Sequence, residues 1–245
     1  NQFYVDGVNT TDPATNTFGT NMNYDAIEAI EVVTGGMDAE YGRSLGGVVN
    51  IVTKSGGNDF EGNATVIYSH PSFVVAPTQE GDSTDTEMSE QFVANLGGPI
   101  IKNRLWFFTS AQFDRIISAA SVDPDIGRDL TRFPMEPMDW KSLYLFGKLT
   151  FQPTPEHRLW LHVQGDPTWI NNATQDVYTL PSAESVQTEK GWLMSLGHQY
   201  TPSENLLLET QLYYQEFEIK WFSILWNQCG EFDASGVCID DFVGT

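Results

Sequence analysis

The sequence has few basic side chains and no long apolar run. It contains 12 Lys and Arg residues against 33 Asp and Glu residues, a formal net charge of −21 at pH 7. Nucleic acid as a partner is excluded, because phosphate binding needs clustered Lys and Arg. No apolar stretch approaches the roughly 18 residues of a transmembrane helix, and the opening residues show no signal-peptide pattern. Strands that alternate apolar and polar residues can still cross a membrane.

Cysteine and histidine are also scarce. The segment between Cys229 and Cys238 contains Gly, Asp and Ser. It favours a small exposed disulfide loop in an oxidising compartment, and two free thiols are the alternative. The four histidines lie in unrelated segments, so no metal-ligand or catalytic-triad spacing emerges. We therefore expect no enzyme, no catalytic residue and no cofactor.

From residue 58 onward, apolar and polar residues alternate with a period of two. In the clearest segment, Leu159, Leu161 and Val163 alternate with polar residues. Short and long links between these segments also alternate along the chain. The pattern predicts an antiparallel up-and-down meander with short turns at one end, as in an outer-membrane β-barrel. About seven segments show it: 60–68, 90–98, 105–115, 141–151, 158–166, 190–200 and 206–218.

The polar side of these segments is expected to face the interior of the barrel. There it would line the lumen or hold another part of the chain. The candidates are Arg158, His162, Gln164, Glu209 and Gln211. The rival interpretation is a soluble β-rich binding domain, which a detergent-free soluble chain would favour.

Residues 1–55 have a different character. β-branched runs at 31–34 and 48–53 predict strands, residues 9–23 predict a loop, and 25–29 can form a helical turn. The motif Gly35-Gly36, Glu40-Tyr41-Gly42-Arg43 and Gly46-Gly47-Val48-Val49-Asn50-Ile51-Val52-Thr53-Lys54 resembles the C-terminal half of the plug of TonB-dependent outer-membrane receptors. Gly97-Gly98-Pro99-Ile100, followed by an aromatic strand, is similar to the Oar-like subgroup of these receptors.

The resemblance covers about residues 1–115 and implies a fold. That fold is an all-β transmembrane antiparallel up-and-down β-barrel, with a small α/β plug domain. Residues 1–55 would be the C-terminal part of the plug, and residues 56–245 would be barrel strands and extracellular loops. Because the barrel of this family has about twenty-two strands, we expect these residues to be a piece of a longer chain.

The resemblance also implies a function. Such a receptor binds a ligand at the surface of a Gram-negative cell and imports it using the inner-membrane proton-motive force. The implied partners are TonB on the periplasmic side, an extracellular ligand, and outer-membrane lipid with lipopolysaccharide. The alternative is an Oar-like outer-membrane barrel with an adhesion, surface-assembly or structural role.

Candidate site residues follow from the plug resemblance. The outward-facing apex of the plug would place Phe18, Asn21, Tyr41 and Arg43 where they can touch ligand. The alternative role for Glu40 and Arg43 is an ion-paired lock between plug and barrel wall.

A separate acidic loop follows the third of the alternating segments. Asp123, Asp125 and Asp129 could bind calcium through their oxygens, although the loop lacks the longer EF-hand pattern. A solvated acidic rim, bridged by divalent cations to lipopolysaccharide phosphates, is the other interpretation of these residues.

Overall fold

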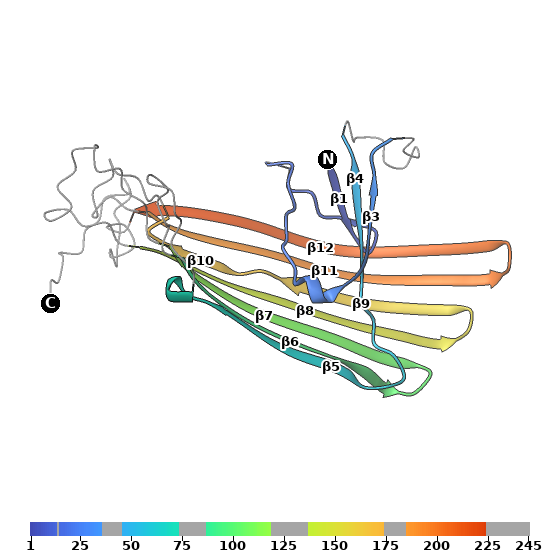
Figure 1. The fold of residues 1–245 in the computed structure, drawn as a ribbon. Helices are drawn as coiled ribbons and strands as arrows, with labels where there is room; N and C mark the ends of the chain where they lie inside the picture. The colour runs from blue at the N-terminus through green and yellow to red at the C-terminus, as the bar shows by residue number, and fades with distance from the viewer. Residues whose placement is uncertain (14, 36–45, 74–86, 119–136, 174–184, 224–245) are drawn as a thin grey trace, which may run out of the picture.

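The computed structural model describes residues 1–13, 15–35, 46–73, 87–118, 137–173 and 185–223 (Figure 1). Two sheets account for most of them, one small and one large. Among the described residues, no helix is long and apolar enough to cross a membrane.

The small sheet has four strands in the order β2-β1-β4-β3. They are β1 (Gln2–Val5), β2 (Val8–Asn9), β3 (Ile27–Val33) and β4 (Val48–Thr53). β1 and β2 form a hairpin whose turn, Asp6 and Gly7, has positive φ at both residues. β1 runs parallel to β4, and β3 runs antiparallel to it.

The helical turn expected over 25–29 is shorter in the structure. A 3-10 turn, η1 (Tyr24–Ala26), is capped by the Asn23 side chain, which accepts from the Asp25 amide. The chain then enters β3 at Ile27, because residues of β3 pair with β4 and satisfy their backbone groups there. A second 3-10 turn, η3 (Pro71–Phe73), follows the first strand of the large sheet.

The large sheet is antiparallel and has eight strands. β9 and β10 both pair with β8 and β11, so together they form one crossing of the sheet, which is interrupted at Asp166 and Pro167. Proline cannot donate to a ladder, which explains the break. The predicted seven crossings are therefore present. The strands are β5 (Glu61–Ser69), β6 (Glu87–Ile101), β7 (Leu105–Ser118), β8 (Met138–Thr154), β9 (His157–Gly165), β10 (Thr168–Asn171), β11 (Ser185–Ser203) and β12 (Leu206–Ser223).

Short turns join β6 to β7, β8 to β9 and β11 to β12 at one end of the sheet (Figure 1). The longer links leave from the opposite end. Within the described part of the chain the sheet is open, with β5 and β12 as its end strands. This layout matches the predicted meander and places the short turns on the periplasmic side of a barrel.

The two faces of the sheet have opposite character. On the outer face, register places Leu149, Leu161, Leu196 and Leu212 in one row across four strands. Leu196 is 48% exposed and Leu212 is 68% exposed. Exposed apolar residues of the same face include Val66, Tyr68, Phe92, Leu96, Leu145, Phe151, Trp192, Met194, Leu206, Leu208 and Tyr214. A lipid-facing barrel wall has this arrangement, apolar outside and polar inside.

The small sheet lies against the inner face of the large one (Figure 1). Val5, Val8 and Ile51 of the small sheet form a buried cluster with Leu193 of β11. Ala26 of η1 packs with Phe108 and Phe146 of β7 and β8. We call the large sheet, β5 to β12, the wall. These apolar contacts are few, so polar contacts contribute strongly to the attachment of residues 1–53 to the wall.

Candidate functional site

A buried ion pair joins the turn of the small sheet to the wall. Lys148 Nζ of β8 lies 2.9 Å from Asp6 Oδ2, and both side chains are 8% exposed. Thr53, at the end of β4, completes the cluster. Its amide and hydroxyl donate to the two Asp6 carboxylate oxygens, and its hydroxyl oxygen accepts from Lys148 at 2.8 Å. We call Asp6, Lys148 and Thr53 the latch. A buried pair persists only when its remaining hydrogen bonds are satisfied, as they are here.

Inward side chains of β9 and β12 reach the backbone of residues 1–23. Gln164 donates to the Thr20 carbonyl at 3.4 Å, and Gln211 donates to the Asp6 carbonyl at 3.0 Å. Gln164 Oε1 accepts from His162 Nε2, which leaves Nδ1 of that fully buried ring 3.9 Å from Asp6 Oδ2. These three residues face the interior, as the alternation predicted.

A second polar contact holds the loop at 9–23. Asp166, in the break between β9 and β10, accepts from the amide and the side chain of Asn21 at 2.6 and 2.9 Å. Its other oxygen accepts from the Gly191 amide of β11 at 2.6 Å. Asp166 is 5% exposed. The carboxylate therefore ties the loop to two strands of the wall at once.

Two further contacts anchor the region around η1. Asn23 donates to the Ser110 hydroxyl of β7 at 2.6 Å. Asp25 accepts from Asn95 of β6 at 2.9 Å. The wall from β6 to β12 thus holds residues 6–53 through side chains that are far away in sequence.

An outer cavity of about 540 Å³ lies between the loop at 9–23 and the wall, toward the end of the sheet that carries the long links. Phe18 and Asn21, two of the predicted ligand contacts, both line it. Phe18 also packs edge-to-face on Phe3, with ring centroids 5.5 Å apart. The other lining residues are Asp12, Thr15, Thr17, Gly19, Asp166, Glu189, Lys190, Gly191, Phe217, Glu218 and Ile219.

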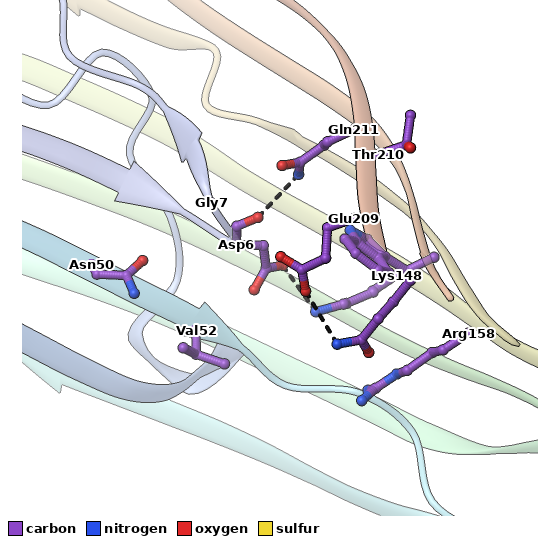
Figure 2. Close-up of a pocket in the computed structure, with 11 residues that line it drawn as sticks. Asp6, Gly7, Asn50, Val52, Lys148, Arg158, Glu209, Thr210 and Gln211 are labelled. Carbon is purple, nitrogen blue, oxygen red and sulfur yellow. Dashed lines mark hydrogen bonds and ion pairs between the residues drawn. The ribbon is translucent and has the colours of Figure 1, made fainter. Parts of the chain in front are cut away.

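An inner cavity of about 350 Å³ lies beside the latch, toward the short turns (Figure 2). The β1–β2 turn and β4 form one side, and β8, β9, β11 and β12 form the other. Arg158 and Glu209, predicted to face inward, both line it. The remaining lining residues are Asp6, Gly7, Asn50, Val52, Lys148, Trp160, Gln199, Thr210 and Gln211.

Several predicted site residues lie outside the described part of the chain. They are Glu40, Tyr41, Arg43, the candidate calcium ligands Asp123, Asp125 and Asp129, and the cysteines Cys229 and Cys238. The latch and Asp166 were not singled out from the sequence. A usable signal existed for Lys148, a lysine on the inward side of a strand whose other side is apolar.

Family comparison supports both parts of this arrangement. Residues 1–48 match the TonB-dependent receptor plug domain, and residues 52–124 match an outer membrane beta barrel domain. The TonB-dependent transporter Oar of Myxococcus xanthus is 30% identical over 195 residues, which are 69% of this chain and 18% of that protein. The ferric enterobactin receptor of Pseudomonas aeruginosa is 30% identical over 145 residues, 55% of this chain and 18% of that protein.

A probable TonB-dependent siderophore receptor, PirA of Acinetobacter baumannii, is 29% identical over 140 residues, 57% of this chain and 17% of that protein. The chain spans about a fifth of the length of these relatives. Among solved structures, the ferric enterobactin receptor PfeA of P. aeruginosa shares the fold, with a TM-score of 0.55 and 18% identity, over 96% of this chain and 35% of that one. The plug match, the barrel match and the apolar outer face agree, and the chain belongs to the TonB-dependent receptor family of the bacterial outer membrane.

Proposed function

We propose that the receptor containing this chain binds a ligand at the cell surface and imports it, with TonB supplying energy from the proton-motive force. The observation that carries the proposal is the position of residues 1–53. They are attached to the inner face of the wall by the latch and by the Asn21–Asp166 contact. A plug held by polar contacts closes the lumen and can still be moved, since each contact can be replaced by water.

Within this proposal, residues 1–55 are the plug and residues 56–245 belong to the barrel. The outer cavity is the plug's contribution to ligand binding, with Phe18 and Asn21 on its plug side. The described residues supply binding and positioning groups, and the function requires no covalent chemistry from them. Tyr41 and Arg43, predicted to lie at the apex of the plug, would add further ligand contacts.

The test compares three strains of the source bacterium: wild type, a strain lacking the receptor and a strain lacking TonB. Each grows in the same complex medium, and mass spectrometry follows which small molecules disappear. We expect at least one compound to be depleted by wild type and left in the medium by both mutants. If the two mutants deplete every compound as wild type does, while cell–cell adhesion is lost in the receptor mutant, the adhesion role replaces import.

A further inference from the structure

A groove of about 510 Å³ lies on the outer face of the wall, on the side away from the plug. Its floor is made of small residues on β7 and β8. Ala111 and Thr109 are exposed there, and Gly147 lies opposite Thr109 in the register. No atom lies within 4 Å of a Cβ placed at Gly147, so the space above it is open. The larger side chains that border this groove, the wall groove, are Leu145, Val163 and Trp192.

The strands that form the wall groove reach the membrane surface a short distance above it. β7 begins at Leu105, after a short turn, and its outward residues stay uncharged as far as Phe113. Arg115 is the next outward residue. The rise from Leu105 to Arg115 is about 34 Å along the strand and about 25 Å after the strand tilt, which is the height of the apolar band of a barrel. Arg115 therefore lies at the level of the outer-leaflet headgroups.

Two basic side chains share one carboxylate at this level. Lys141 of β8 is the register partner of Arg115. Arg115 Nε lies 2.9 Å from Asp139 Oδ1, and Lys141 Nζ lies 2.7 Å from Asp139 Oδ2. A guanidinium has five N–H donors and an ammonium has three, and Asp139 engages only some of them. Because the Arg115 and Lys141 side chains are 34% and 37% exposed, the remaining donors can reach a ligand.

The nearest other acidic group is on the far side of Arg115. Glu90 of β6 is the other register partner of Arg115, so two strand spacings, about 10 Å, separate it from Lys141. On the opposite side, Trp169 of β10 is the register partner of Lys141 and is 47% exposed. An amphipathic indole is common at the membrane interface. The position between Arg115 and Lys141, toward β8, is therefore the place where an anionic headgroup meets least repulsion.

We propose that this face binds a phosphorylated lipid of the outer leaflet, the lipid A part of lipopolysaccharide. One acyl chain occupies the wall groove, and a phosphate binds between Arg115 and Lys141. Phe113 and Leu143, which are register partners, give the chain an apolar path between the two. Charge complementarity selects the occupant, because a phosphate accepts hydrogen bonds from both cations and lipid A places no ammonium group beside it. The site lies outside the barrel and does not depend on the proposed import function.

The experiment uses the intact receptor, purified in detergent and freed of bound lipid. Native mass spectrometry counts the lipid molecules bound as lipid is added. The probes are diphosphoryl lipid A, the same lipid A with its phosphates removed, and phosphatidylglycerol. We expect lipid A to bind in a saturable step and the dephosphorylated form to bind at least about tenfold more weakly. If phosphatidylglycerol or dephosphorylated lipid A binds as tightly as lipid A, the proposal is overturned.

A double variant tests the two cations. Arg115→Gln combined with Lys141→Gln keeps polar side chains without the charges, and we expect it to weaken lipid A binding about tenfold. The matched control is Lys190→Gln combined with Lys220→Gln. These lysines belong to the same face but are paired with two carboxylates, Glu216 and Glu218, and Lys220 does not border the wall groove. Equal binding by the two double variants would show that Arg115 and Lys141 do not hold the phosphate.

A separate variant tests the wall groove itself. Gly147→Phe fills the open space above Gly147 and leaves both cations in place. We expect lipid A to bind about tenfold more weakly, because the acyl chain loses its seat. Heat-modifiable migration on a gel confirms that each variant is folded. Wild-type affinity in folded Gly147→Phe would overturn the placement of the chain in the groove.

Discussion

Replacing Lys148 by methionine tests whether the latch holds the plug. The change removes the ammonium group 2.9 Å from Asp6 Oδ2 and leaves a carboxylate that is 8% exposed with Thr53 as its donor. Removing one partner of a buried pair costs about 3–5 kcal/mol, because the other charge stays buried and unpaired. If the plug opens locally from the wall, that cost raises the population of the open state roughly a hundred- to a few thousand-fold.

Native-state hydrogen exchange on the intact receptor in detergent measures this opening. The reporter is the backbone amide of Asn21, which donates to the Asp166 carboxylate across the contact between plug and wall. We expect this amide to exchange faster in Lys148→Met by the stated factor, because it loses its acceptor when the plug leaves the wall. Adding Asp6→Asn to that variant removes the stranded charge and should restore most of the protection.

Lys141→Met is the matched control for this prediction. Lys141 pairs with Asp139 at 2.7 Å on the outer side of the wall, but its side chain is 37% exposed. Pairs as exposed as this one contribute about 0–1 kcal/mol. Equal exchange of the Asn21 amide in Lys148→Met and Lys141→Met would refute the reasoning that burial makes the latch strong.

Three other changes probe the wall and the outer contact. Asp166→Ala leaves the buried Gly191 amide without its acceptor at a cost of about 1–3 kcal/mol and removes the partner of Asn21, so limited proteolysis should then cut the loop at 9–23 faster. Gly197→Val should lower the yield of folded receptor, because a Cβ at this position would lie 2.0 Å from the Trp160 ring, and adding Trp160→Ala should restore the yield. Leu149→Lys puts a charge on the lipid-facing side and should destabilise the barrel by about 2–4 kcal/mol in denaturant titrations.

Each of these changes has a control in the same chain. Asp166→Asn keeps one acceptor and should fall between wild type and Asp166→Ala. Gly147→Val should be tolerated, because nothing lies within 4 Å of a Cβ at Gly147. Glu90→Lys introduces the same side chain on the same face nearer the long-link end, where the membrane penalty falls to about 0–1 kcal/mol. If a variant and its control have indistinguishable effects, the environment that the structure assigns to the substituted residue is wrong.

The sequence by itself determined the strand crossings of the wall and which side chains face outward. The period of two places Leu149 and Leu196 outside and His162 and Gln164 inside, since successive side chains of a strand point to opposite faces. Short links between alternating segments identify antiparallel neighbours. These are local properties, so seven crossings and their facing could be predicted without coordinates. The break at Asp166 and Pro167 was also visible in principle, because proline cannot continue a ladder.

Tertiary structure alone decided the contacts between plug and wall. Asp6 and Lys148 are 142 residues apart, and Asn21 and Asp166 are 145 residues apart. No local pattern pairs such residues, because the pairing depends on how a separate sheet seats on the inner face. The resemblance to a plug suggested Glu40 and Arg43 as the lock, and this stays a prediction outside the described residues. The latch at Asp6 and Lys148 became visible only when the fold brought the β1–β2 turn against β8 and buried both charges together.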